Sequence, residues 1–321
     1  MNHGTRRNRI SRLLLAVSCG WVALVACPLV AAEPLLWKLA VGQELHYQMG
    51  QLMTMGMDMG AAGEMKTDVK QQIDMAWQVE SIDEKGDAVI QQQITRIRMT
   101  LNAPGQQETK FDTASKEEPQ GFAAMAAPML KGLIATPFQV TMTSQGEITD
   151  VEVPEAMVEA VRNSPAGEMM GEFASADGLK SMVQQGLLVL PQGDDLVKGH
   201  SWTATNEMEV PNLGKLTLER AYRYEGPRKV DGQNMEVFAL AMTMEYGDSA
   251  GPDGSTIEVV AQESKGEILF NRDAGCLESS SLRQVMDQRI SMAGQVMNQK
   301  IDQTVSLKRV DKPEALAPTA E

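Results

Sequence analysis

The chain has 321 residues, with 29 basic and 43 acidic side chains and a formal net charge of −14. It is long enough for one large or two modest domains with a sizeable core, and its apolar content of 43% is ordinary for a globular protein. The negative charge argues against binding to nucleic acid or to an anionic lipid surface. Because 23 residues are methionine and only 4% are aromatic, methionine and aliphatic side chains must fill much of the core.

Residues 1–32 have the layout of a secretory signal peptide. A start with four arginines precedes an apolar run over residues 13–27, and the small residues Val30 and Ala32 suit cleavage before Glu33. Removing those four arginines would lower the net charge from −14 to −18. The sequence therefore predicts an exported protein of the periplasm or cell envelope.

Residues 24–27 (LVAC) also resemble a lipobox, in which Cys27 would carry a lipid and anchor the N-terminus. Simple cleavage is favoured, because the ordered pattern begins at residues 35–37 and leaves little tether. After ordinary cleavage Cys276 alone remains, so an intrachain disulfide is excluded and a small buried side chain is expected there. No later segment has the eighteen or so apolar residues that a membrane span needs.

Residues 49–82 predict a long β-hairpin. Methionines occupy alternate positions of the first arm, and apolar residues occupy the odd positions of the second, with charged and amide side chains between them. A period of two places the apolar set on one face of the strands. The tip at residues 60–63 (GAAG) can turn without steric penalty.

Further elements follow up to residue 190. The patterns predict a strand at residues 88–101, a polar loop at 102–118 and a short helix at 121–135 that Pro128 interrupts. A hairpin at residues 138–153 turns at Gln145-Gly146. Two helices follow, at residues 154–161, opened by Pro154, and at residues 167–190, stopped by Pro191.

The second half of the chain repeats the order of the first. Residues 197–202 resemble 41–45, and residues 215–225 resemble 67–80, in order and spacing more than in identity. This pattern indicates an internal duplication. The chain then closes with a second long hairpin over residues 282–310, which turns at Ala293-Gly294.

These patterns predict a mainly β protein of the α+β class, with antiparallel sheets from long hairpins and two related β-rich halves separated by a few helices. Such hairpins must either pack sheet on sheet or curl and be covered by helices, and the second arrangement would leave a hollow lined by methionine. The expected divisions are a signal peptide (residues 1–32), a first β-rich half (33–153), a helical connector (154–190), a second β-rich half (191–311) and a disordered tail (312–321).

Five segments together resemble an uncharacterised family of exported bacterial proteins that is common in planctomycetes and is defined by a domain of unknown function. They are residues 35–42 (LLWKLAVG), the methionine-dense hairpin, and residues 138–148, 190–202 and 266–277. The similarity spans nearly all of the chain after the signal. It implies export and a β-rich fold, and it implies no catalytic residues.

The row Met53, Met55, Met57 and Met59 is a candidate Cu(I) site, because thioethers are soft ligands. The same row continues on the paired arm as a core face would, so a core role is favoured over a metal role. Residues 247–251 (GDSAG) fit the pattern of serine hydrolases, but a strand rather than a helix is expected after them, so a hairpin loop is favoured. No enzyme activity and no cofactor are therefore predicted.

The leading hypothesis is a non-enzymatic envelope protein that binds a hydrophobic ligand or a protein partner. A Cu(I)-binding protein and a purely structural envelope component are the alternatives.

Overall fold

The computed structural model describes residues 34–58, 63–105, 107–117, 119, 122–163, 175–193, 196–210, 214–247, 255–292 and 295–312. The predicted signal peptide with Cys27, Met59, most of the 247–251 motif and the tail after Lys312 lie outside these residues. The elements in chain order are β1 (Glu44–Asp58), β2 (Glu64–Ile82), β3 (Ala88–Asn102), β4 (Thr109–Asp112), α1 (Phe122–Ala135), β5 (Phe138–Met142), β6 (Ile148–Glu152), α2 (Glu155–Arg162), α4 (Ala176–Gln185), β7 (Ser201–Val210), β8 (Gly214–Val230), β9 (Gln233–Tyr246), β10 (Thr256–Asn271), β11 (Cys276–Met292) and β12 (Gln295–Val310).

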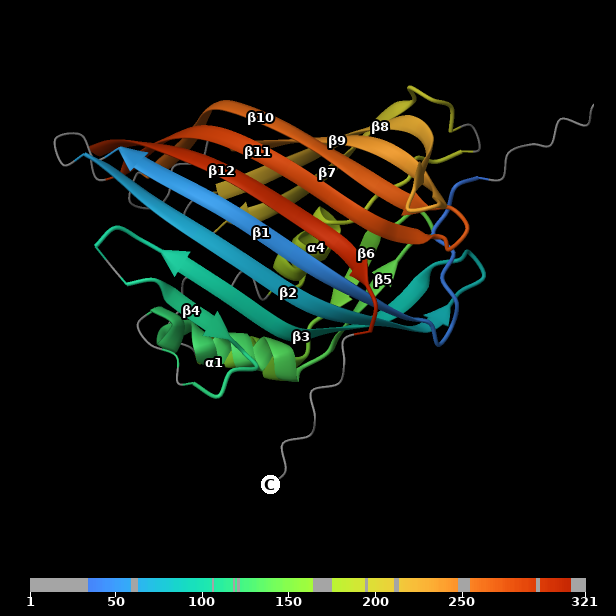
Figure 1. Cartoon of the computed structure of the whole chain (residues 1–321), viewed down its shortest axis with the longest axis horizontal. Coiled ribbons are helices and arrows are strands. Elements are labelled where there is room, and N and C mark those ends of the chain that lie inside the picture. Colours follow the sequence, from blue (N-terminus) through green and yellow to red (C-terminus); the bar gives the residue numbers. More distant parts are fainter. Residues whose placement is uncertain are drawn as a thin grey trace, which may run out of the picture. The chain divides into compact units, whose positions relative to one another are not determined.

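The described strands form one antiparallel sheet in the order β6-β5-β3-β2-β1-β12-β11-β10-β9-β8-β7, with β4 paired to β3 alone. The prediction of a mainly β fold with few helices is confirmed. Strands of the first β-rich half lie on one side of the β1–β12 seam and those of the second half on the other (Figure 1). The sheet therefore begins at β6, ends at β7, and joins its two sides in the middle.

The long hairpin predicted for residues 49–82 is present as β1 and β2, and its register explains the alternation. Met49 pairs with Ile73, Met53 with Val69, and Tyr47, fully buried, with Met75. Odd positions of both strands therefore share the inner face of the sheet. On the outer face, Arg98 and Asp74 form one of several ion pairs between neighbouring strands.

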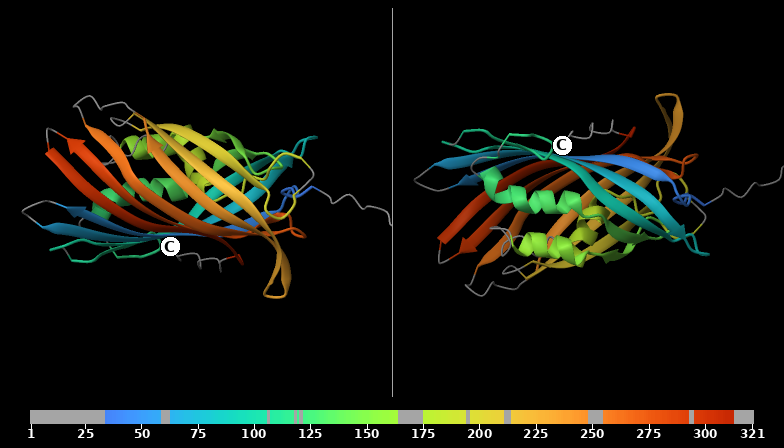
Figure 2. Two further views of the ribbon diagram at one scale, coloured as in Figure 1. Left: turned by 90° about the horizontal axis from the view of Figure 1, so that it is seen from above. Right: turned by 90° about the horizontal axis from the view of Figure 1, so that it is seen from below.

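The sheet is curved, and the helices lie on its inner face (Figure 2). α1 packs on β3 and β4, where Ala127 and Leu130 meet Ile94, Ile97 and Phe111 in a small apolar cluster. α4 lies between the first and last strands of the sheet and packs on β6 and β7. Of the two solutions open to long hairpins, the chain adopts the curled sheet covered by helices.

The main core lies between the sheet, α4 and the segment that follows α4. Trp37 packs edge-on against Phe270, with ring centroids 5.3 Å apart, and Tyr47 packs on Trp77. Cys276 is completely buried in this core and forms no disulfide, and burial raises the pKa of its thiol. This agrees with its predicted role as a small buried side chain.

Three local predictions are wrong. The polar loop predicted for residues 102–118 contains β4, because Phe111 is buried under α1 and Asp112 pairs with Arg96. Helix α1 continues through Pro128, since its packing on β3 and β4 outweighs the loss of one helical hydrogen bond.

The third error concerns residues 187–190, which were expected to be helical. α4 ends at Gln185, and residues 187–190 are not helical, because the carbonyl groups of Leu188 and Val189 are bound by the indole nitrogens of Trp37 and Trp202.

Three glycines occupy turns with a positive φ angle, as the sequence predicted. Gly146, in the β5–β6 turn, has φ +89°, and Gly42 and Gly199, in the two segments that the duplication compares, have φ +81° and +91°. The amide of Gly42 donates to Val79 O and that of Gly199 to Tyr224 O, each over 2.8 Å. The two turns are thus alike in structure, while the duplication itself stays a prediction.

Candidate functional site

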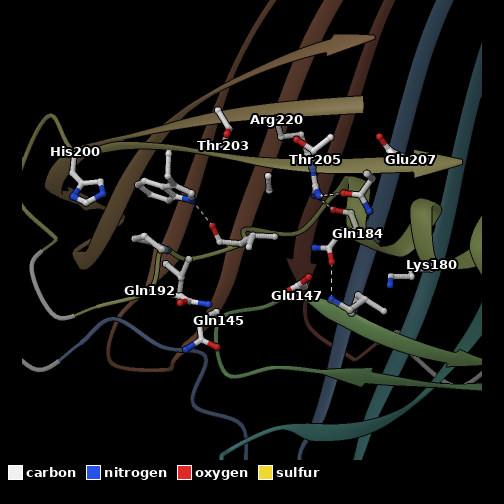
Figure 3. A pocket seen from close by; sticks show the side chains of 17 residues that line it. Gln145, Glu147, Lys180, Gln184, Gln192, His200, Thr203, Thr205, Glu207 and Arg220 are labelled. Atoms are coloured by element: carbon white, nitrogen blue, oxygen red, sulfur yellow. Dashed lines mark hydrogen bonds between the residues drawn. The ribbon is translucent and has the colours of Figure 1, made fainter. Parts of the chain in front are cut away.

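A groove of about 630 Å³ lies between the two ends of the sheet. One wall is β7, the other is formed by the β5–β6 turn and α4, and residues 189–192 run along it (Figure 3). Figure 3 shows Lys180, Gln184 and Arg220 toward one end of the groove and Gln145, Gln192 and His200 toward the other. Most of the lining side chains are polar.

Gln184 joins the two ends of the sheet at the bottom of this groove. Its side-chain oxygen accepts from the amide of Ile148 over 2.6 Å, and its side-chain nitrogen donates to Gly146 O over 3.1 Å. Its main-chain carbonyl accepts from Arg220 Nη1 of β8 over 2.5 Å. Gln184 is 2% exposed, so one buried residue connects β6, α4 and β8.

The segment after α4 is held by three aromatic side chains. Indole nitrogens donate to successive carbonyls, Trp37 to Leu188 O over 3.2 Å and Trp202 to Val189 O over 2.8 Å. The Tyr222 hydroxyl donates to Leu187 O over 3.5 Å. The amide of Leu190 donates to Gln145 O, which closes the opposite side. These bonds satisfy carbonyls of a segment without regular secondary structure, which would otherwise be buried without partners.

Arg220 carries a positive charge into the interior. It is 4% exposed, and its Nη2 donates to Asn206 Oδ1 of β7 over 2.6 Å. The bond from Nη1 reaches a carbonyl at the C-terminus of α4, where the helix dipole is negative. Burial raises the pKa of the neighbouring Tyr222 hydroxyl, and the positive charge of Arg220 opposes this rise.

Arg220 was not among the predicted site residues, although the pattern of β8 contains a signal for it. Residues 216, 218, 222 and 224 are Leu, Leu, Tyr and Tyr, all buried on the inner face of β8. Arg220 occupies the same alternate set and interrupts it with a charge. A charged residue at an inward position needs a partner or a ligand.

The predicted methionine row lies elsewhere, on the inner face of the hairpin toward its tip. Met53 and Met55 are half-buried, and Met55 Sδ lies 3.8 Å from Gln299 Nε2. Met57 pairs across the strands with Met65, which is 48% exposed. Among the described residues, no three His, Cys, Asp or Glu side chains form a group that could hold a metal ion.

Within the described part of the chain, no helix is both long and apolar enough to cross a membrane.

Residues 85–237 match the model of DUF6263, a family of unknown function. The match confirms the resemblance to an uncharacterised family with a domain of unknown function, while export and a planctomycete source stay predictions. The search of curated proteins found no match.

Three solved structures are similar in part. A lipovitellin structure, described as showing lipid–protein interactions, has 11% identity and a TM-score of 0.48 over 88% of this chain and 27% of that chain. DynF of the dynemicin biosynthesis pathway of Micromonospora chersina has 8% identity and a TM-score of 0.22, over 89% and 90% of the two chains. An outer membrane channel from Pseudomonas putida F1 has 7% identity and a TM-score of 0.21, over 88% and 99%.

This chain thus spans about a quarter of the lipovitellin chain, 27% of its length. With TM-scores below 0.5, these similarities support no functional argument.

Proposed function

We propose that this protein is a non-enzymatic, exported binding module that holds an extended segment of a protein partner along the free edge of β7. The observation that carries the proposal is that six consecutive residues of β7, residues 202–207, line the groove. Successive side chains of a strand point to opposite faces of the sheet. A groove that contacts six in a row must therefore run along the edge of the strand.

The edge of β7 offers hydrogen-bonding groups to such a segment. β7 is the last strand of the sheet and pairs with β8 on one side only. In the described chain, no backbone hydrogen bond joins residues 202–207 to any element other than β8. Every second residue of an antiparallel edge strand points its N–H and C=O groups outward, and proteins use such edges to bind a partner strand.

The leading hypothesis also allowed a hydrophobic ligand. The inner face of the sheet supports such a ligand less well than the groove supports a peptide. α1 and α4 cover much of that face. A small apolar pocket beside Met49, Ile73 and Leu307 has a volume of about 20 Å³, which is room for one water molecule. The larger groove is polar and suits a peptide backbone better than a lipid chain.

The test is to pan displayed linear peptides against the protein and to follow amide hydrogen exchange with the selected peptides. Strand addition should slow exchange at alternate amides of residues 202–207 and leave those of β11 unchanged. Protection at another element, or failure to select any peptide that protects β7, would contradict the proposal.

Proline at Ala204 and at Thr205 forms a matched pair of variants. One of these amides points to β8 and the other to the groove, because neighbouring residues of a strand alternate. The substitution that removes the outward amide should abolish peptide binding with little loss of stability, whereas the other should destabilise the sheet.

A Cu(I) site is a second candidate, and the register of the hairpin favours a revised ligand set. Met65 lies directly opposite Met57, and Met55 precedes Met57 on the same face. Three thioethers from Met55, Met57 and Met65 would suit Cu(I), a soft ion. In this set Met65 takes the place of Met53 and Met59 of the predicted row. The side chains of a cross-strand pair lie closer together than those of residues two apart on one strand.

A further inference from the structure

We infer that the segment bound along β7 presents a carboxylate, from Asp or Glu, to Arg220 and Lys180. The inference rests on the proposed function and names the chemistry of the partner. The hydrogen-bond partners of Arg220 are both neutral: the carbonyl of Gln184 and the side-chain amide of Asn206.

Arg220 differs in this respect from most arginines of the protein. Eight others that the structure describes have a carboxylate oxygen within 4.0 Å, and all of them are more exposed than Arg220. They are Arg96, Arg98, Arg223, Arg228, Arg272, Arg283, Arg289 and Arg309. Arg220 has no such ion pair within the described residues. Among the residues that the structure describes, the most deeply buried guanidinium thus lacks a counter-ion, which is costly for a buried charge.

The groove provides the place for that counter-ion. Arg220 lines the groove, and a guanidinium has five N–H donors. Within the protein, one donor of Nη1 binds Gln184 O and one of Nη2 binds Asn206 Oδ1. Arginine binds carboxylates in a planar, two-bond geometry that a lysine does not reproduce. An acidic side chain of the bound segment would supply the missing charge.

Lys180 adds a second positive charge on the same side. It lies one helical turn before Gln184 on α4, so the two residues share a face. Its Nζ lies 3.4 Å from the carbonyl of Thr149, a neutral acceptor, and it too has no carboxylate partner in the described chain. Lys180 also lines the groove.

Two acidic residues line the groove as well. Glu207 is already paired with Lys215, over 2.7 Å, so its charge is largely compensated. Glu147 is exposed and therefore well solvated. The balance of charge near Arg220 and Lys180 stays positive in a protein whose net charge is −14. The contrast favours an acidic segment at this one place and repulsion elsewhere.

The experiment uses three capped seven-residue peptides of alternating Thr and Val that carry Glu, Gln or Lys at the central position. Binding to the full protein is measured by fluorescence anisotropy at low and high NaCl concentration. The Glu peptide should bind about tenfold more tightly than the Gln peptide, and the Lys peptide most weakly. Added salt should reduce this preference, because ions screen partly exposed charges.

Two variants locate the effect. Lys180→Gln removes a partly exposed charge and should lower the Glu-over-Gln preference about threefold, while Lys308→Gln, an exposed and equal charge change on β12, should leave it unchanged. Arg220→Lys keeps the charge but loses the two-bond geometry, so it should lower the preference further.

The outcomes separate the inference from the proposed function. Equal binding of all three peptides, with protection of the β7 amides, would overturn the acidic preference and leave strand addition standing. Absence of binding by all three, or protection away from β7, would overturn both.

Discussion

Replacing Gln184 by Met tests whether one buried amide holds the two ends of the sheet together. The side chains are similar in volume, so the change removes hydrogen bonds with little change in packing. The amide of Ile148 loses its 2.6 Å acceptor and Gly146 O loses a 3.1 Å donor, while the main-chain bond to Arg220 is retained. An orphaned buried N–H costs about 1–3 kcal/mol and an ordinary bond about 1 kcal/mol, so we expect a loss of about 2–4 kcal/mol.

The assay is urea unfolding followed by circular dichroism and tryptophan fluorescence, compared between the wild type and the variant. Gln192→Met is the control, because Gln192 is exposed and lines the same groove, and its cost should stay within about 0.5 kcal/mol. A loss below about 1 kcal/mol for Gln184→Met would refute the reasoning that this side chain bridges the sheet ends.

Three further predictions concern other parts of the molecule. Gly146→Ala should destabilise the protein by about 2–4 kcal/mol more than Gly193→Ala in the same urea assay. Both glycines have positive φ, but a Cβ at Gly146 would lie 2.3 Å from Leu188 O, whereas a Cβ at Gly193 would meet no atom within 4 Å. Equal losses of stability in the two variants would disprove the packing argument. Asp112→Asn should lower the free energy of unfolding at neutral pH, because hydrogen bonding to Arg96 lowers the pKa of Asp112 below its usual 3.8. This loss should vanish as the pH falls through the lowered pKa, and a loss that is independent of pH from 7 to 2 would contradict the prediction. Met57→Leu should weaken Cu(I) binding, measured by competition with a chromogenic chelator, and leave the unfolding midpoint unchanged. The control Met292→Leu, at an exposed methionine, should leave both the Cu(I) affinity and the midpoint unchanged. Unchanged Cu(I) affinity in Met57→Leu would remove the second candidate function.

Alternation of apolar and polar residues was sufficient to predict the long hairpins, because a period of two is set by the geometry of a strand itself. The turn at Gly146 was predicted for a similar local reason. The closing hairpin was predicted over residues 282–310, and β11 and β12 pair there from Ser279 with Lys308 to Met292 with Gln295.

The errors arose where distant residues decide the structure. β4 depends on Phe111 meeting α1. The non-helical course of residues 187–190 depends on bonds from Trp202, Tyr222 and Trp37, which lie 13, 35 and 151 residues from the carbonyls they bind. The groove was not predicted at all, since it exists only where β6 and β7 come near α4. Arg220 could have been identified as an inward charge, but its neighbours in the groove could not.

The seam between β1 and β12 has a consequence for how the chain folds. Ser306 donates to the carbonyl of Gly50 across 256 residues of sequence. Closing a loop of that length costs about 3 kcal/mol more entropy than closing a ten-residue loop. Each side of the sheet can form from neighbouring hairpins, but the seam must wait for the last strand. Until then the long edge of β1 is exposed, and association with β12 of another copy competes with correct closure.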